Sequence, residues 1–206
     1  MHEINTPLSI INVNVDLFDS IHGKNKYLNR IKSATKSLAT IYNDMDYLIK
    51  QNRVDYPKEK IDLNAFVQER IDYFELICQL KDISLVFTHD VHATLRFNPV
   101  KLQRIIDNTL SNAIKFSYAH GKIEVNMKRG EDGKVVLQFK DYGQGIENPE
   151  KILEGYYRED NLKNGFGIGM RIVKSIIDEE SVRLTIVSQP GKGSIFRYAF
   201  TPLYIG

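Results

Sequence analysis

Residues 105–116, Ile-Ile-Asp-Asn-Thr-Leu-Ser-Asn-Ala-Ile-Lys-Phe, decide the fold of the larger part of this chain. Asn108, Asn112 and Lys115 follow one another at spacings of four and three residues, so they share one face of an α-helix. The opposite side is apolar and consists of Ile105, Ile106, Leu110, Ala113 and Ile114. Pro99 suits the first turn of a helix, and we therefore predict one amphipathic helix from there to about Ser117.

Strands and two further helices are predicted on either side of this helix. A segment from Asp62 to Asn64 could cap a helix over 65–80, and another helix is expected over 169–179. The turn carrying Asp132-Gly133 joins two alternating segments into a hairpin. The predicted strands cover residues 83–87, 93–97, 123–128, 135–140, 183–188 and 194–201. Helices gathered on a mixed, largely antiparallel sheet predict an α+β domain over residues 61–206.

In the first 53 residues the apolar residues have a different spacing, which predicts an all-α helical hairpin. Apolar residues recur at alternating spacings of four and three, which is the seam of a coiled-coil-like helix. A polar break at residues 22–26 separates two such seams, and residues 54–60, with Pro57, are predicted to be a linker. A hairpin buries only a strip of each helix, so we expect a homodimer that completes a four-helix bundle. The seams are Ile4, Leu8, Ile11, Val15 and Phe18, then Ile31, Ala34, Leu38, Ile41, Met45 and Leu48.

Composition excludes several classes of protein. The net charge of +2 and the absence of a basic run argue against a nucleic-acid partner. The single Cys78 excludes an internal disulfide framework, fits a reducing compartment, and is predicted to be a buried structural residue. No apolar run approaches the ~18–20 residues of a membrane span, and no signal peptide opens the chain. We expect a cytoplasmic location without membrane contact for this sequence, compatible with a membrane-bound sensor upstream.

The octapeptide His2-Glu3-Ile4-Asn5-Thr6-Pro7-Leu8-Ser9 carries the first candidate chemistry. With Ile4 and Leu8 in the seam, His2 and Thr6 lie four residues apart on the outward face, beside Glu3. Neutral imidazole is a good nucleophile near pH 7, and an adjacent carboxylate can accept its second N–H proton during attack. The competing interpretation is an ordinary surface histidine.

The polar face of the helix over 99–117 carries the second group of candidate site residues. Amide oxygens such as those of Asn108 and Asn112 suit Mg²⁺, and Lys115 can neutralise phosphate charge. A solvated polar face is the alternative interpretation.

Two glycine-rich stretches complete the set. Asp141-Tyr142-Gly143-Gln144-Gly145-Ile146 follows a strand, so the carboxylate could accept a hydrogen bond from an exocyclic amino group such as that of adenine, while Gly143 and Gly145 permit close backbone approach. Gly165, Gly167 and Gly169 lead into a helix whose free N–H groups favour phosphate. The spacing is neither that of a dinucleotide fingerprint nor that of a P-loop. Each stretch alone is compatible with an ordinary turn; their order and spacing together favour a nucleotide site.

With these motifs together, the sequence resembles the catalytic core of a bacterial two-component sensor histidine kinase, over essentially its whole length. Five stretches carry the resemblance to the family's H, N, F, G1 and G2 boxes: His2–Leu8, Asn108–Phe116, Ile152–Arg158, Asp141–Ile146 and Gly165–Val173. Residues 191–196 resemble the last glycine motif. The sequence departs from the family pattern at Leu153, where a phenylalanine is usual, and in its short lid of six residues, 159–164.

The resemblance implies a dimerisation and phosphotransfer hairpin followed by a GHKL-type ATP-binding sandwich. It implies that ATP phosphorylates His2 and that the phosphoryl group passes to an aspartate on the receiver domain of a response regulator. It assigns an acid/base role to Glu3, orientation of a dephosphorylating water to Thr6, and the γ-phosphate to Arg158. It also assigns Mg²⁺ to Asn108 and Asn112, phosphate to Lys115, and adenine to Asp141.

Two alternatives stay open at this stage. One is a phosphatase-dominant or inactive scaffold that binds ATP and a response regulator. The other is a related GHKL-type ATPase or serine kinase, against which the hairpin bearing His2 argues.

Overall fold

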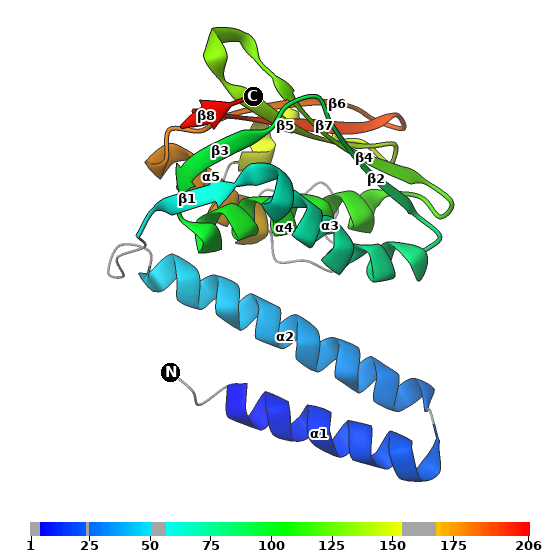
Figure 1. Ribbon diagram of the computed structural model, residues 1–206. Coiled ribbons are helices and arrows are strands. Elements are labelled where there is room, and N and C mark those ends of the chain that lie inside the picture. Colours follow the sequence, from blue (N-terminus) through cyan, green and yellow to red (C-terminus); the bar gives the residue numbers. More distant parts are fainter. Residues whose placement is uncertain (1–4, 24, 51–56, 154–167) are drawn as a thin grey trace. The chain divides into compact units, whose positions relative to one another are not determined.

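The computed structural model describes residues 5–23, 25–50, 57–153 and 168–206. The chain divides into two compact units, residues 1–55 and 56–206. Figure 1 labels the helices and strands of both.

The first unit is a helical hairpin of α1 (Asn5–His22) and α2 (Lys26–Lys50). Gly23 ends α1 with a φ of +82°, a conformation that costs glycine little, and its N–H donates to the carbonyl of Asp19 at 2.9 Å. The Asn25 side chain then caps α2 by accepting from the N–H of Tyr27 at 2.8 Å. The expected hairpin and its short loop are therefore present.

Only part of the predicted seam is covered within one hairpin. Leu8 and Val15 are buried, whereas Ile11 and Phe18 remain 39% and 46% exposed. On α2 the buried side chains include Thr35, which donates to Asn12 Oδ1 at 2.6 Å across the hairpin. The exposed large apolar side chains of the α2 seam include Ile31, Leu38 and Met45.

The second unit is built on a five-stranded mixed sheet of order β2-β4-β5-β7-β6. Its strands are β2 (Ser84–His89), β4 (Lys122–Arg129), β5 (Val135–Asp141), β7 (Gly193–Phe200) and β6 (Arg183–Gln189). The β2–β4 pair is parallel, and the other three pairs are antiparallel. Three helices lie together on one side of the strands (Figure 1): α3 (Leu63–Gln79), α4 (Pro99–Phe116) and α5 (Ile168–Glu179). This arrangement confirms the predicted α+β class.

A second, smaller sheet was not predicted. It has the order β1-β3-β8, from β1 (Glu59–Asp62), β3 (Ala93–Phe97) and β8 (Tyr204–Ile205), all antiparallel. Since β1 begins at Glu59, the last two residues of the predicted linker 54–60 belong to a strand. The sequence hides β1 because only Ile61 in it is apolar and buried, so no alternation is visible. Two short 3₁₀ segments complete the unit, η1 (Glu131–Gly133) and η2 (Pro149–Leu153).

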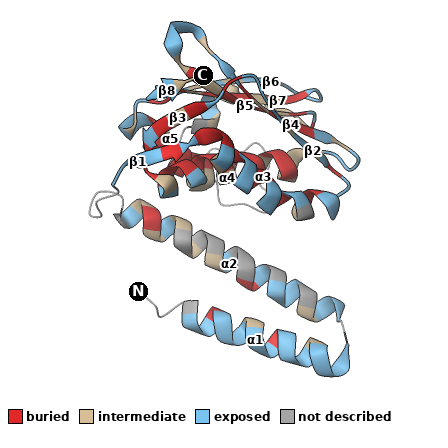
Figure 2. Ribbon diagram, viewed as in Figure 1, coloured by how far each residue is buried: buried red, intermediate tan, exposed pale blue. Residues whose placement is uncertain are grey.

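The core lies where α4 packs on the sheet, and Figure 2 shows this buried layer. Asn98 caps α4 by accepting from the N–H of Lys101 at 3.0 Å, with Pro99 in the first turn as predicted. Cys78 is buried, as predicted, and burial raises the pKa of its thiol. The side chains of α4 that are fully buried are Leu102, Ile105, Ile106 and Leu110.

One buried polar contact fixes α4 on the sheet. The Thr109 hydroxyl donates to the carbonyl of Ile105 at 2.7 Å, which leaves its oxygen to accept from the Tyr198 hydroxyl, also at 2.7 Å. Tyr198 of β7 is fully buried, and burial raises the pKa of its hydroxyl, which stays protonated.

This contact predicts an asymmetric pair of substitutions. Thr109→Val should lower the free energy of unfolding by roughly 1–3 kcal/mol, because it leaves the buried Tyr198 hydroxyl without a partner. Tyr198→Phe should cost about 1 kcal/mol or less, since Thr109 keeps its bond to Ile105. Urea unfolding of both variants and of the double variant measures this. Equal costs for the two single variants would contradict the assigned donor and acceptor.

Candidate active site

The polar face of α4 meets the first turn of α5 at one close contact. A Cβ added to Gly169 would lie 2.3 Å from Asn108 Oδ1, so only glycine allows this approach. Asn108 Nδ2 donates to the carbonyl of Arg104 at 2.8 Å, which fixes the amide so that Oδ1 lies against Gly169. Two of the predicted site residues, distant in sequence, are thereby brought together.

The loop after β5 is held by three glycines at backbone contacts too close for any side chain. An added Cβ would lie 2.1 Å from the Phe116 carbonyl oxygen at Gly143 and 2.1 Å from the Gln189 oxygen at Gly145. At Gly193 it would lie 2.0 Å from the carbonyl oxygen of Asp141. Gly145 and Gly193 also have positive φ values, +71° and +91°, which disfavour other residues. The loop therefore sits against the end of α4 and the β6–β7 turn.

Hydrogen bonds secure the same loop from both sides. The N–H of Gln144 donates to the carbonyl of Phe116 at 3.1 Å, and its carbonyl accepts from the N–H of Gly191 at 2.7 Å. The N–H of Ile146 donates to Ser188 Oγ at 2.8 Å. The loop is thus fixed before any ligand binds.

Asp141, the last residue of β5, is only 6% exposed. Burial raises the pKa of its carboxyl, and hydrogen bonds from Gly143 and Ser194 act in the opposite direction. Asp141 Oδ1 accepts from the N–H of Gly143 at 2.9 Å. A buried carboxylate held in this way can accept a further hydrogen bond from an exocyclic amino group, such as that of adenine.

Two serines behind Asp141 were not singled out from the sequence. Ser194 bonds Asp141 and lies 3.0 Å, Oγ to Oγ, from Ser188. Ser188 donates to the carbonyl of Gly193 at 2.9 Å while accepting from Ile146. Serine is common in turns, so the signal was slight; the position of Ser194 directly after the glycines of residues 191–193 was the available sign.

The remaining predicted residues fall into two groups. Asn112 and Lys115 are half-buried on α4, and Lys115 Nζ lies 4.8 Å from the Phe116 ring centroid. Thr6 is exposed on α1 in the helical unit. His2, Glu3, Arg158, Gly165 and Gly167 lie outside the described residues.

The donors on α4 fit a magnesium nucleotide better than a metal held by the protein alone. In the described part of the chain, no group of three or more His, Cys, Asp or Glu side chains could hold a metal ion. Neutral amide oxygens such as Asn108 Oδ1 suit Mg²⁺ when substrate phosphates supply the negative ligands.

Comparison with known proteins identifies the family. The profile described as "Histidine kinase-, DNA gyrase B-, and HSP90-like ATPase" matches residues 97–204, more than half of the chain. The chain belongs to this family of ATPases. The match begins at the end of β3 and takes in α4, Asp141, the three loop glycines and Gly169.

Relatives extend the similarity to the helical unit. "Sensor protein kinase WalK" of Staphylococcus aureus is 28% identical over 95% of this chain. This chain spans 50% of that relative and 34% of the same protein from strain JH9, so it corresponds to half or less of their length. No helix in the described ranges is both long and apolar enough to cross a membrane.

Solved structures show the same fold. "Acinetobacter baumannii histidine kinase AdeS" matches with a TM-score of 0.69 at 18% identity, covering 99% of both chains. Full-length ShkA, in a structure with AMPPNP, matches with a TM-score of 0.78 at 18% identity over 98% of this chain and 44% of its own. "Mycobacterial sensor histidine kinase MprB" matches with a TM-score of 0.61 at 22% identity over 70% of this chain and 97% of its own.

The glycine contacts of this ATPase fold predict a sharp difference between two glycines. Gly143→Ala should lower the free energy of unfolding by roughly 1–3 kcal/mol, because the methyl group must displace the carbonyl at the end of α4, and it should abolish nucleotide binding. Gly133→Asn is the control, since nothing lies within 4 Å of an added Cβ there and asparagine tolerates its φ of +70°. Thermal unfolding and titration with a fluorescent ATP analogue measure both variants. Normal nucleotide binding by Gly143→Ala would contradict the loop's role.

The raised pKa of Asp141 predicts the pH dependence of nucleotide affinity. A carboxyl whose pKa is higher in the folded than in the unfolded protein costs stability at neutral pH, and this cost is relieved as the pH falls through the folded pKa. Asp141→Asn should therefore unfold at neutral pH no more easily than the native chain. Native affinity for an adenine nucleotide should fall as Asp141 takes up its proton, at a pH above that of an ordinary carboxyl.

Asp141→Asn is also the control that separates protonation of Asp141 from protonation of the nucleotide's own phosphates. Asp141→Asn should bind the nucleotide weakly, and its affinity should lack the acid limb seen in the native chain. Calorimetric titrations of both proteins across the acid range measure the difference. Parallel profiles would show that Asp141 does not contact the base.

Proposed function

We propose that this chain is the catalytic core of a sensor histidine kinase, which transfers the γ-phosphoryl group of ATP to His2 and then to an aspartate of a response regulator. The observation that carries the proposal is the preformed loop 141–146 against the end of α4, in a chain that also has a helical hairpin. Similarity to sensor kinases over 95% of the chain supports it.

In this proposal the described residues bind and orient the nucleotide. Asp141 accepts a hydrogen bond from the adenine amino group, and the glycine contacts hold the loop that follows Asp141 in place. Asn108 and Asn112 present amide oxygens to Mg²⁺, which when bound neutralises phosphate charge. Lys115 adds a positive charge on the same helix face, and the free N–H groups at the N-terminus of α5, beside Gly169, favour phosphate. Gly165 and Gly167, which lie outside the described residues, are proposed to contact the phosphates as well.

In the proposed transfer, a bond from His2 to the γ-phosphorus forms while the bond from that phosphorus to ADP breaks. A ring nitrogen of His2 attacks the γ-phosphorus, the bond from that phosphorus to the β–γ bridging oxygen breaks, and ADP leaves. The proton on the second ring nitrogen passes to Glu3, and Arg158 neutralises charge on the transferred group. Positioning and charge neutralisation supply most of the rate, as is usual for phosphoryl transfer.

A second copy of the chain is the proposed partner for the exposed seam. Ile11 and Phe18 of α1 and Ile31, Leu38 and Met45 of α2 are apolar side chains left exposed within one hairpin. Two hairpins packed through these positions form the four-helix bundle that the sequence predicts. The single hairpin supports this proposal because it leaves its own seam open.

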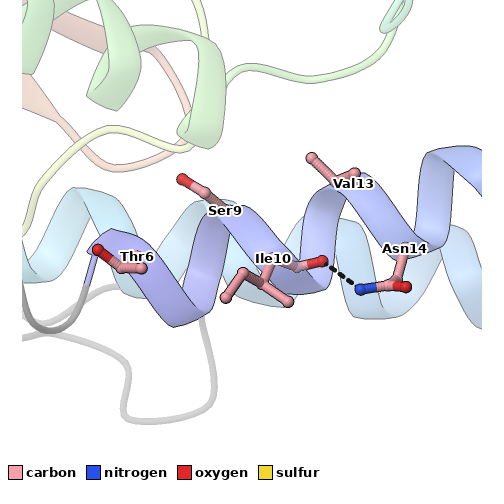
Figure 3. A pocket seen from close by; sticks show the side chains of 5 residues that line it. All are labelled: Thr6, Ser9, Ile10, Val13 and Asn14. Carbon is pink, nitrogen blue, oxygen red and sulfur yellow. Dashed lines mark hydrogen bonds between the residues drawn. The ribbon is translucent and has the colours of Figure 1, made fainter.

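The response regulator is proposed to dock on the opposite side of α1. Figure 3 shows Thr6, Ser9, Ile10, Val13 and Asn14 along this face, and the apolar stripe continues to Leu17. Ile10, Val13 and Leu17 are 56%, 65% and 57% exposed and lie away from the buried Leu8 and Val15. Because His2 precedes Thr6 by only four residues in the sequence, we propose that a regulator bound here meets His2.

A second activity, removal of the phosphoryl group from the regulator, is supported by the exposure of Thr6 on that same face. There its hydroxyl could orient a water for attack. A GHKL-type ATPase or serine kinase is less well supported, because neither would use the hairpin with its outward stripe.

Incubation with γ-labelled ATP and Mg²⁺ tests the proposal. We expect an acid-labile, base-stable label that is lost in His2→Asn and retained in the control His22→Asn, which replaces the histidine at the C-terminus of α1. A form extended upstream through its native sequence is run in parallel. Label that survives in His2→Asn would overturn the assignment of His2.

The chain labelled on His2 is then used to test where the regulator docks. Val13→Asp should slow transfer to a receiver domain by at least tenfold, because it puts a charge into the proposed apolar contact, while His2 is labelled normally. Unchanged transfer would remove the stripe from the docking surface.

A further inference from the structure

An ion-pair network around the buried Glu180 joins the start of the second unit to both helices of the proposed nucleotide site. Glu180 follows the last residue of α5, and its side chain is 2% exposed. Its Oε2 lies 2.6 Å from Lys58 Nζ and its Oε1 lies 2.9 Å from Lys101 Nζ. Lys101, in the first turn of α4, is 4% exposed and also pairs with Glu179 at 2.6 Å.

The charges in this network are held firmly. Burial alone would raise the pKa of Glu180, yet the hydrogen bonds from Lys58 and Lys101 hold it below the usual range. Burial would likewise lower the pKa of Lys101, and its two glutamate partners raise it instead. Glu180 and Lys101 are therefore both charged at neutral pH.

A hydrogen bond between uncharged groups holds Pro57, the residue before Lys58. Asn98, the cap of α4, donates from Nδ2 to the carbonyl of Pro57 at 2.9 Å while its Oδ1 caps the helix. Pro57 and Lys58 are the first residues described after the hairpin, so the chain is fastened to α4 and α5 as soon as it enters the second unit.

The two helices run antiparallel between this network and the nucleotide site. Lys101 meets Glu179 and Glu180 at one end, and Asn108 meets Gly169 at the other. Lys58 is therefore fastened to the ends of α4 and α5 that lie away from the contact of Asn108 with Gly169, so the direction of the entering chain can change while the nucleotide site stays intact.

We propose that Lys58 and Glu180 are positioning residues for phosphoryl transfer, which fix the direction in which the chain leaves the ATP-binding unit toward the hairpin. This inference rests on the proposed kinase function. Neither residue touches the nucleotide; they act through Pro57, α4 and α5. Transfer to His2 requires the two units to meet in one orientation, and a small misplacement of reacting groups is costly.

Three single variants of the full chain test this inference. Lys58→Met breaks the link to the chain and leaves the Lys101–Glu180 pair in place, whereas Lys58→Arg keeps a cation. Lys174→Met is the matched control, because Lys174 is 42% exposed, compared with 47% for Lys58, and pairs with Asp178 on the same helix.

Three quantities are measured for each variant: the initial rate of His2 labelling at saturating Mg-ATP, the dissociation constant of a non-hydrolysable ATP analogue, and the melting temperature. Lys58→Met should label His2 roughly five- to tenfold more slowly, with the dissociation constant and the melting temperature nearly unchanged. Lys58→Arg and Lys174→Met should label at the native rate.

Each of the other outcomes would contradict either the positioning role of Lys58 or the proposed kinase function. If Lys58→Met labels as fast as the native chain, the positioning role is wrong and the kinase function stands. If its rate falls only together with nucleotide affinity or melting temperature, the network merely stabilises the domain. If the native chain, with or without its upstream sequence, does not label, the proposed function fails and this inference fails with it.

Discussion

The structure depends on three places where backbone approaches backbone too closely for any side chain. Gly143 lies against the end of α4, Gly145 against the end of β6, and Gly193 against the end of β5. These contacts determine where the loop after Asp141 can lie, so they also determine where its carboxylate points. A methyl group at any of the three would have to move a carbonyl that is already part of a helix, a strand end or a turn. The loop is preorganised, and a ligand need not meet the entropic cost of ordering it.

Helix α4 contacts the sheet, the entering chain, the loop after β5 and helix α5. These contacts bring the loop and the polar face of α4 together in the candidate site. The apolar side of α4 packs on the sheet, its cap residue Asn98 binds the entering chain, and its last carbonyls receive the loop. The polar face lies where α5 begins, at the contact of Asn108 with Gly169. The buried bond of Thr109 to Tyr198 sets the rotation of the helix on the sheet, which keeps Asn108 and Asn112 off the core. An amphipathic helix with asparagines on one side is therefore both the main packing element and the wall of the proposed nucleotide site.

Much of this could be predicted from the sequence because the signals were local. The helix at 99–116, its proline, the hairpin turn at Asp132-Gly133 and the α1–α2 loop all depend on residues close together in the chain. The elements that were missed depend on distant partners. The strand at 59–62 exists because it pairs with β3, and Ser188 and Ser194 matter only because two strands bring them beside Asp141. The link of Lys58 to Glu180 likewise joins residues far apart in the sequence of the second unit, and nothing in either local sequence indicates it.

We propose that the loop held by the three glycines and the polar face of α4 form one nucleotide site. Amide chemical shifts of the isotope-labelled chain, measured during titration with Mg-ADP, test it most directly. We expect the largest changes at Gly143, Gly145 and Gly169 and at the side-chain amides of Asn108 and Asn112, with little change along α1. Shifts confined to other surfaces, or none at saturating nucleotide, would contradict it.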